Sequence, residues 1–199
     1  MFFDTTRAHV EIAGARAIDC VVEEAKDHTL RAPFKGNMDI EKLRGLIEKH
    51  GADKIAYVRI ETGTNLIGGQ PHSLENMQEI RKVCDEFGLM LVLDASLLAD
   101  NLYFIKTREE KCKDMSIREI TRAMADLSDI IYFSARKLGC ARGGGICIRD
   151  KDLPLWAGVD QLGRSAPRAT GDQQLTKSYL TAARATVDQL IARGALRPN

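Results

Sequence analysis

The chain has 199 residues, of which 44% are hydrophobic and 29% charged, and its 29 basic and 28 acidic side chains give a formal net charge of +1. A chain of this length and composition forms a domain of ordinary size, which argues against disorder and against a small disulfide-stapled scaffold. Because the net charge is close to zero, we expect neither nucleic acid nor an acidic membrane as a partner. The longest apolar stretches, such as 89–93, are too short to cross a bilayer.

The cysteine pattern indicates the compartment. The chain has no CxxC pair and no histidine at the spacing of a zinc site, so we expect neither a disulfide framework nor a metal centre. Cysteines in a chain without a recognisable signal peptide fit a reducing environment, and we expect a cytoplasmic protein. The five cysteines are Cys20, Cys84, Cys112, Cys140 and Cys147.

The first third of the chain alternates apolar runs with a helical pattern. We predict a strand over 18–22, a helix between Asp39 and Gly51, and a second strand over 54–60. An aspartate can cap the first turn of a helix, and a glycine can end it in the left-handed conformation. The apolar residues of the predicted helix recur at helical spacing, at Leu43, Leu46 and Ile47.

The middle of the chain continues the alternation. We predict helices over 73–88 and 116–127, the second opened by a Ser-x-x-Glu capping box, and strands over 89–93, 130–133 and 146–148. The strand over 89–93 is apolar at every position, as expected for a strand covered on both faces. Strands and helices that alternate at this spacing form βαβ units. The sequence therefore predicts an α/β fold with a mostly parallel sheet and helices on both faces.

The character of the chain changes near Asp150. Prolines and glycines interrupt the next stretch of some twenty residues, and a helical pattern over 175–191 closes the chain. We therefore predict two units, a core of residues 1–150 and a divergent tail of residues 151–199. The abrupt start at Met1 also leads us to expect that the chain begins within a larger fold.

Two polar residues follow buried strands, where parallel α/β sheets bind their ligands. Asp94 comes directly after the apolar strand, so its carboxylate must be paired or functional, and the alternative role is a helix N-cap. Lys137 follows the strand over 130–133 and can act as a nucleophilic amine if it is desolvated, whereas the alternative is an exposed loop lysine. One helix lies between them, so we expect both to face one ligand from neighbouring strands.

Two glycine-rich loops need separate interpretation. The loop over 62–71 is longer than most connections, and its Asn65 can donate an amide hydrogen bond to a ligand, although a plain connection is the alternative. The run Arg142-Gly143-Gly144-Gly145 matches no nucleotide-binding motif because it precedes a strand, and we expect a tight hairpin there. The histidines are weak candidates for catalysis.

Taken together, these residues resemble the tryptophanase and tyrosine phenol-lyase family of β-eliminating lyases over about residues 1–150. The resemblance rests on segments that occur in the order and approximate spacing of that family. These segments are Phe3-Asp4-Thr5-Thr6-Arg7, Phe34-Lys35-Gly36-Asn37, Asn65 with Gly68-Gly69-Gln70-Pro71, Asp94 with Asn101-Leu102-Tyr103-Phe104-Ile105-Lys106, and Ser134-Ala135-Arg136-Lys137.

The resemblance implies the large domain of the fold-type-I, aspartate aminotransferase-like enzymes, which bind pyridoxal 5′-phosphate. Lys137 resembles the lysine that binds this cofactor covalently, and Asp94 resembles the carboxylate that keeps its pyridine nitrogen protonated. An acid beside a pyridinium and a nucleophilic amine are groups that this cofactor requires. Lys137 and Asp94 are therefore the candidate catalytic residues, and both belong to the candidate cofactor site.

Four more residues enter the cofactor site through the resemblance. Asn65 would hydrogen-bond the 3′ oxygen of the cofactor, Phe3 would stack on its ring, and Ser134 and Arg136 would lie near its phosphate. Leu97 departs from the family, which has an arginine next to the 3′ oxygen at that position, and this difference indicates a changed pocket.

The implied reaction is α,β-elimination of an amino acid to pyruvate and ammonia. Asp4 is the candidate substrate-binding residue, because tryptophanases have an aspartate at this position and tyrosine phenol-lyases a threonine, which favours a tryptophan-like substrate. Cysteine or thiocysteine lyase chemistry stays open because of Leu97. The family is also activated by a monovalent cation such as K⁺.

The segments that complete this site in the family have no counterpart in the chain. We therefore expect a homo-oligomer, or a partner chain that supplies them. The alternative is a truncated, non-catalytic relative that acts as a cofactor-binding or interaction module.

Overall fold

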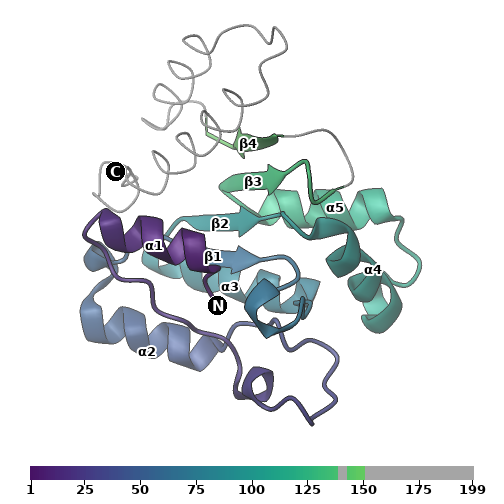
Figure 1. The fold of residues 1–199 in the computed structure, drawn as a ribbon, viewed down its shortest axis with the longest axis horizontal. Helices are drawn as coiled ribbons and strands as arrows, with labels where there is room; N and C mark the ends of the chain where they lie inside the picture. The colour runs from purple at the N-terminus through teal and green to yellow at the C-terminus, as the bar shows by residue number, and fades with distance from the viewer. Residues whose placement is uncertain (139–142, 151–199) are drawn as a thin grey trace, which may run out of the picture.

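The computed structural model describes residues 1–138 and 143–150, whose centre is a four-stranded sheet (Figure 1). Its strands are β1 (Val58–Glu61), β2 (Leu91–Asp94), β3 (Ile130–Ser134) and β4 (Gly144–Ile148), in that spatial order. The pairs β1–β2 and β2–β3 are parallel, and β4 runs antiparallel to β3. The predicted α/β fold with a mostly parallel sheet is confirmed. The predicted tail of residues 151–199 and its helix lie outside the described residues.

Local capping signals set the ends of the helices. Helix α2 (Ile40–His50) begins where the Asp39 side chain accepts a 2.9 Å hydrogen bond from the backbone N–H of Lys42, and it ends at Gly51, whose φ is +83°. Helix α3 (Leu74–Phe87) begins at an N-cap serine and ends at a left-handed glycine. Helix α5 (Ile117–Leu127) opens with the predicted capping box, formed by Ser116 and Glu119. These three predicted helices are confirmed.

Two more helices complete the α-helices of the described part of the chain. Helix α1 (Asp4–Ile12) follows Phe3, and helix α4 (Leu98–Arg108) follows β2. None of the helices within these residues has the length and apolar composition that crossing a membrane requires.

The sheet separates two hydrophobic clusters. The larger cluster joins one face of the sheet to α2, α3, α4 and α5, and it includes Ile47, Met77, Ile80, Leu91, Leu93, Ile105, Ile120 and Met124. The smaller cluster lies on the other face, around Met90, Val92, Ile130 and Tyr132. Helix α1 begins on this second side, where the Phe2 ring packs on Arg59, whereas α3 lies behind the sheet in Figure 1. Helices therefore cover both faces, as predicted.

The predicted strand over 18–22 is wrong. Within residues 1–138 and 143–150, its one β-type pairing is an isolated antiparallel bridge between Val21 and Met38. The N–H of Asp39 donates to the carbonyl of Cys20 at 2.7 Å, and the N–H of Val22 donates to the carbonyl of Asn37 at 3.2 Å. Cys20 and Val21 are buried, and the backbone of this run bonds to the segment that leads into α2 instead of to a strand of the sheet.

The end of the described sheet is a hairpin pair, as the glycine run predicted, although residues 139–142 of the connection lie outside the described residues. Ser134 stands opposite Gly144, and Phe133 opposite Gly145. A Cβ atom on Gly145 would lie 2.8 Å from the Phe133 ring, so the site requires glycine. The predicted strand over 54–60 is shorter than expected, because a 3₁₀ turn (Ala52–Lys54) precedes it and β1 begins at Val58.

Candidate active site

The carboxyl ends of β1, β2 and β3 lie at one edge of the sheet and position most of the candidate residues. Glu61 stands opposite Asp94, and Asp94 opposite Tyr132, in the two parallel pairs. Ser134 ends β3, and Lys137 lies in the turn directly after it. Asp94 ends β2 and Lys137 follows β3, so both lie at the carboxyl ends of neighbouring parallel strands, as expected.

Asp94 belongs to a buried charged cluster that sequence reasoning missed. One of its carboxylate oxygens, Oδ2, accepts a 2.5 Å hydrogen bond from Nη2 of Arg59. The other, Oδ1, accepts from the backbone N–H of Ser96 at 3.0 Å. Helix α4 starts later, with Leu97 as its N-cap residue, so the alternative role of Asp94 as a helix N-cap is wrong. Asp94 is a paired carboxylate, as its buried position required.

Arg59 lies at the centre of this cluster. Its Nε donates to the Tyr132 hydroxyl at 2.7 Å, and both of its terminal nitrogens lie 3.3 Å from Oε2 of Glu61. The side chains of Arg59, Glu61 and Asp94 are 2%, 4% and 2% exposed. Arg59 and Glu61 alternate along β1, so they share the sheet face of Asp94. Charged residues at alternate positions of a buried strand were the available signal.

The charges of the cluster act on each other in a low-polarity environment. Burial disfavours the Arg59 cation, but Tyr132, Asp94 and Glu61 outweigh it and raise the pKa of the guanidinium. Burial also raises the pKa of the Glu61 carboxyl; Arg59 opposes this rise, and the neighbouring Asp94 charge reinforces it. Burial and the nearby Asp94 charge thus both favour the protonated form of Glu61.

Lys137 and Phe3 lie in contact. The Lys137 Nζ is 5.0 Å from the centre of the Phe3 ring, and its backbone N–H donates to the Ser134 carbonyl at 3.1 Å. The Lys137 side chain is exposed, not desolvated as an activated amine requires, because the turn carries it past the end of β3. The structure thus brings together two of the residues that the resemblance assigns to the cofactor.

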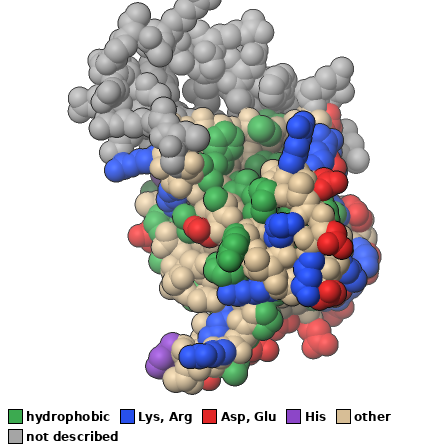
Figure 2. All heavy atoms as spheres, turned by 90° about the vertical axis from the view of Figure 1, so that its right-hand side faces the viewer, with side chains coloured by type: hydrophobic (Ala, Val, Ile, Leu, Met, Phe, Trp, Pro, Cys, Tyr) green, Lys and Arg blue, Asp and Glu red, His purple; other side chains and the backbone are tan. Residues whose placement is uncertain are grey.

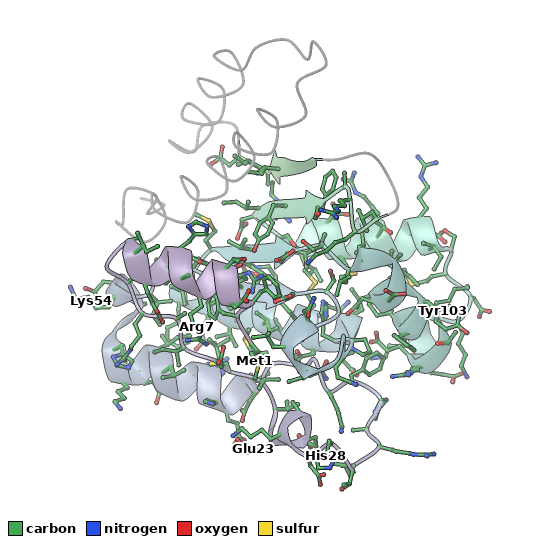
Figure 3. The ribbon with its side chains drawn as sticks, viewed as in Figure 1. Met1, Arg7, Glu23, His28, Lys54 and Tyr103 are labelled. Carbon is green, nitrogen blue, oxygen red and sulfur yellow. The ribbon has the colours of Figure 1, made fainter. Side chains whose placement is uncertain are left out.

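The start of the chain links this contact to the charged cluster. The Phe2 ring lies 5.4 Å from the guanidinium of Arg59. The backbone N–H of Phe2 donates to Asp19 at 2.8 Å, and Asp19 also pairs with Arg7 at 2.7 Å. Figure 3 shows Met1 and Arg7 on this segment, at the front of the view. Phe2 therefore faces the Asp94 cluster and Phe3 faces Lys137.

The remaining predicted residues are more open. Asp4 is exposed in the first turn of α1, where its side chain accepts from the backbone N–H of Thr5 at 2.6 Å. Asn65 is exposed at the start of a 3₁₀ turn (Asn65–Ile67) in the loop after β1. Ser134 is half-buried and Arg136 is exposed. Figure 2 shows side chains of both charge signs together on the face that includes α4 and α5.

The loop that holds Asn65 is fixed by a buried asparagine. The Asn101 Oδ1 accepts from the backbone N–H groups of Gly63 and His72, at 3.1 and 3.0 Å, and its Nδ2 donates to the His72 carbonyl at 3.0 Å. Gly36 packs so closely on Gln70 and Pro71 that a Cβ atom would collide with their backbone. Three of the segments that carry the resemblance, those with Gly36, Gln70-Pro71 and Asn101, therefore meet at this loop.

A cavity of about 380 Å³ lies beside β1, away from Lys137. Its walls include Phe2, Val10, Leu43, Tyr57 and Arg59 from the start of the chain, α1, α2 and β1. Neither Asp94 nor Lys137 lines it, so it is not the predicted cofactor site.

Comparison with known proteins identifies the family of the chain. The family model described as beta-eliminating lyase matches residues 1–194. The chain belongs to the β-eliminating lyase family. It is 43% identical over 154 residues to tyrosine phenol-lyase of Pasteurella multocida, which covers 77% of this chain and 34% of that protein.

Other tyrosine phenol-lyases match the chain with similar identity and coverage. Tyrosine phenol-lyase of Symbiobacterium sp. is 40% identical over 162 residues, 81% of this chain and 35% of that protein, and the enzyme of Clostridium tetani is 42% identical, covering 77% and 34%. The chain thus spans about one third of the length of these curated relatives. A solved transaminase from a marine Virgibacillus has a TM-score of 0.41 at 19% identity, covering 78% of this chain and 31% of that one.

Proposed function

We propose that this chain binds pyridoxal 5′-phosphate and acts in the α,β-elimination of an amino acid to pyruvate and ammonia, as a carbon–carbon or carbon–sulfur lyase. The placement of Asp94 and Lys137 at the carboxyl ends of neighbouring parallel strands, in a chain of the β-eliminating lyase family, supports the proposal. Because the chain spans about a third of its relatives, the proposal includes a second copy or a partner chain that contributes to the site.

The charged groups around Asp94 suit a cationic aromatic ring. The Asp94 cluster holds two carboxylates and one guanidinium, so it can accept a second cation such as a protonated pyridine nitrogen. Asp94 is 2% exposed, so the side chains that cover it must move before a ring nitrogen can reach its carboxylate.

Each candidate residue then has a role that its chemistry supports. When bound, pyridoxal phosphate supplies an electron sink for the bonds at the substrate α-carbon. Asp94 would hold the proton at the ring nitrogen, and the Lys137 amine would bind the cofactor and accept the proton of the α-carbon. Phe3 offers its ring face beside Lys137, and Asn65 offers an amide to the 3′ oxygen.

Two side chains near the end of β3 suit the phosphate. Ser134 offers a hydroxyl donor and Arg136 a fixed positive charge, and an arginine pairs well with phosphate oxygens. Both lie within three residues of Lys137, so one turn would hold the amine and the anion contacts of the same cofactor.

The substrate that we propose is a β-substituted amino acid of the tryptophan type, which Asp4 favours. The relatives named above are tyrosine phenol-lyases, so tyrosine is the comparison substrate. Replacement Asp4→Thr should raise the ratio of kcat/KM for tyrosine to that for tryptophan. An unchanged ratio would exclude Asp4 from substrate choice.

Absorption spectroscopy tests the cofactor proposal. Adding pyridoxal phosphate to the purified chain should produce the visible band of a lysine-bound cofactor, and Lys137→Ala should abolish it. The control Lys111→Ala removes a lysine whose side chain is 84% exposed, and its spectrum should match the wild type. A wild type without such a band would refute the proposal.

Pyruvate release then separates an enzyme from a binding module. The loaded chain is incubated in potassium buffer with tryptophan, tyrosine and S-substituted cysteines, and pyruvate is measured against a blank without protein. Turnover supports the lyase. A bound cofactor with no pyruvate from any substrate would favour the second candidate, a non-catalytic cofactor-binding relative.

A further inference from the structure

The cluster around Asp94 has more acidic than basic side chains. Glu61 and Asp94 stand opposite each other on neighbouring strands, and Arg59 is the guanidinium that contacts both. Tyr132 contributes a hydroxyl from β3, and the amino group of Met1 lies near Glu61 and Arg59 from the chain start. Burial lowers the pKa of that amino group, which favours its neutral form.

The charges of Arg59, Glu61 and Asp94 do not cancel when all three side chains are ionised. With both carboxylates ionised and Arg59 charged, they sum to one negative charge, and a buried uncompensated charge is costly. Arg59 approaches Asp94 more closely, at 2.5 Å against 3.3 Å for Glu61. The surplus charge therefore falls on Glu61, which avoids it by holding a proton.

We propose that Glu61 is a positioning residue that compensates the Arg59 charge when a cationic ring binds, so that Asp94 keeps its negative charge for the ring nitrogen. This inference rests on the proposed function. In the chain alone, Arg59 forms its closer pair with Asp94, and burial together with the Asp94 charge favours a proton on Glu61. A pyridinium beside Asp94 adds one positive charge, and loss of the Glu61 proton restores a balance of two cations and two anions.

A purely structural Glu61 would behave differently. If it served only to hold Arg59 within the fold, its replacement would change stability but would not distinguish ligands with and without a ring nitrogen. The charge-balancing role makes that distinction, because it acts only through a cationic ring.

The test uses pyridoxamine 5′-phosphate, which has the ring nitrogen and the phosphate but does not link covalently to Lys137. Its binding to the full chain is measured by isothermal titration calorimetry at pH 7, in two buffers of different ionisation enthalpy. Glu61→Gln should weaken binding about tenfold, the factor that corresponds to one unit of pKa. It should also release fewer protons than the wild type, by up to about one per site.

Two controls separate the charge effect from general damage. The 1-deaza analogue of pyridoxamine phosphate lacks the ring nitrogen, and its affinity should be the same in Glu61→Gln and wild type. Glu86→Gln is the second control. Glu86 also pairs with an arginine, at 2.6 Å from Arg44, but this pair is exposed and lies outside the Asp94 cluster. This variant should leave both affinity and proton release unchanged.

The outcomes of the two proposals are distinguishable. A wild type that binds neither pyridoxal nor pyridoxamine phosphate refutes the proposed function. A wild type that binds, together with a Glu61→Gln variant of equal affinity and proton release, overturns the Glu61 role and leaves the cofactor proposal standing. If Glu61→Gln fails to fold, wild-type affinity is followed over pH 4 to 7. A steeper pH dependence for pyridoxamine phosphate than for its deaza analogue supports the role, and parallel curves overturn it.

Discussion

His72 makes the stability of the loop beside the candidate site depend on pH. Its side chain is fully buried, its Nδ1 lies 3.1 Å from the Ser73 carbonyl, and the buried Nε2 has no hydrogen-bond partner among the described residues. Burial lowers the pKa of this imidazole from 6.5 to about 4, although the hydrogen bond to Ser73 opposes the change. The folded protein therefore holds a neutral histidine with its proton on Nδ1.

The size and sign of the effect follow from the two pKa values. Between pH 6.5 and about 4 the unfolded chain binds a proton that the folded chain does not, so the free energy of unfolding decreases as the pH falls. At about 1.4 kcal/mol per pH unit, the loss over this window amounts to about 3 kcal/mol. Above pH 6.5 the contribution is constant.

Urea unfolding at a series of pH values measures the contribution of His72 to the free energy of unfolding. The difference in unfolding free energy between wild type and His72→Asn should fall by about 3 kcal/mol from pH 7 to pH 4, because the asparagine does not titrate. His28→Asn replaces an exposed histidine, so its curve should run parallel to that of the wild type. A His72→Asn curve that also stays parallel over the whole range would refute the reasoning.

Three further substitutions test the structure around the site by urea unfolding. Arg59→Met leaves Asp94 and its acidic neighbour without a counter-charge and should cost about 4 kcal/mol, and a loss below 1 kcal/mol would contradict the buried pairing. Asn101→Ala removes three buried hydrogen bonds and should cost about 3 kcal/mol; wild-type stability would show that they do not hold the loop. Gly36→Ala forces a Cβ atom against Pro71 and should cost about 2 kcal/mol, whereas Gly45→Ala, in open space on α2, should not destabilise the chain.

Leu97 and Arg59 determine where positive charge lies near Asp94. Leu97 stands where the resemblance expects an arginine, and a Cβ atom on Gly63 would lie 3.0 Å from the Leu97 side chain. Arg59 lies at the same edge of the sheet and donates hydrogen bonds to Asp94 and Tyr132. The positive charge near the carboxylate therefore comes from β1.

Much of the local structure followed from the sequence. The ends of α2 and α5 depend on Asp39, Gly51 and the Ser116–Glu119 capping box, whose contacts span only three or four residues, so a local pattern is sufficient to predict them. The alternation of strands and helices likewise placed Asp94 and Lys137 at the ends of neighbouring strands. Short-range signals of this kind do not depend on the rest of the fold.

Other features depended on tertiary structure. The run over 18–22 has the composition of a strand, but among the described residues it pairs through a bridge with Met38, before α2, and not with a strand of the sheet. Arg59 and Asp94 are 35 residues apart, and the register between β1 and β2 brings them together. Phe3 and Lys137 meet only because α1 begins over the sheet. Composition and spacing determined the fold class, most of the helices and strands, and the sheet edge that holds the candidate residues. Long-range pairing decided which charged side chains meet at that edge, because residues far apart in the sequence are brought together by strand register.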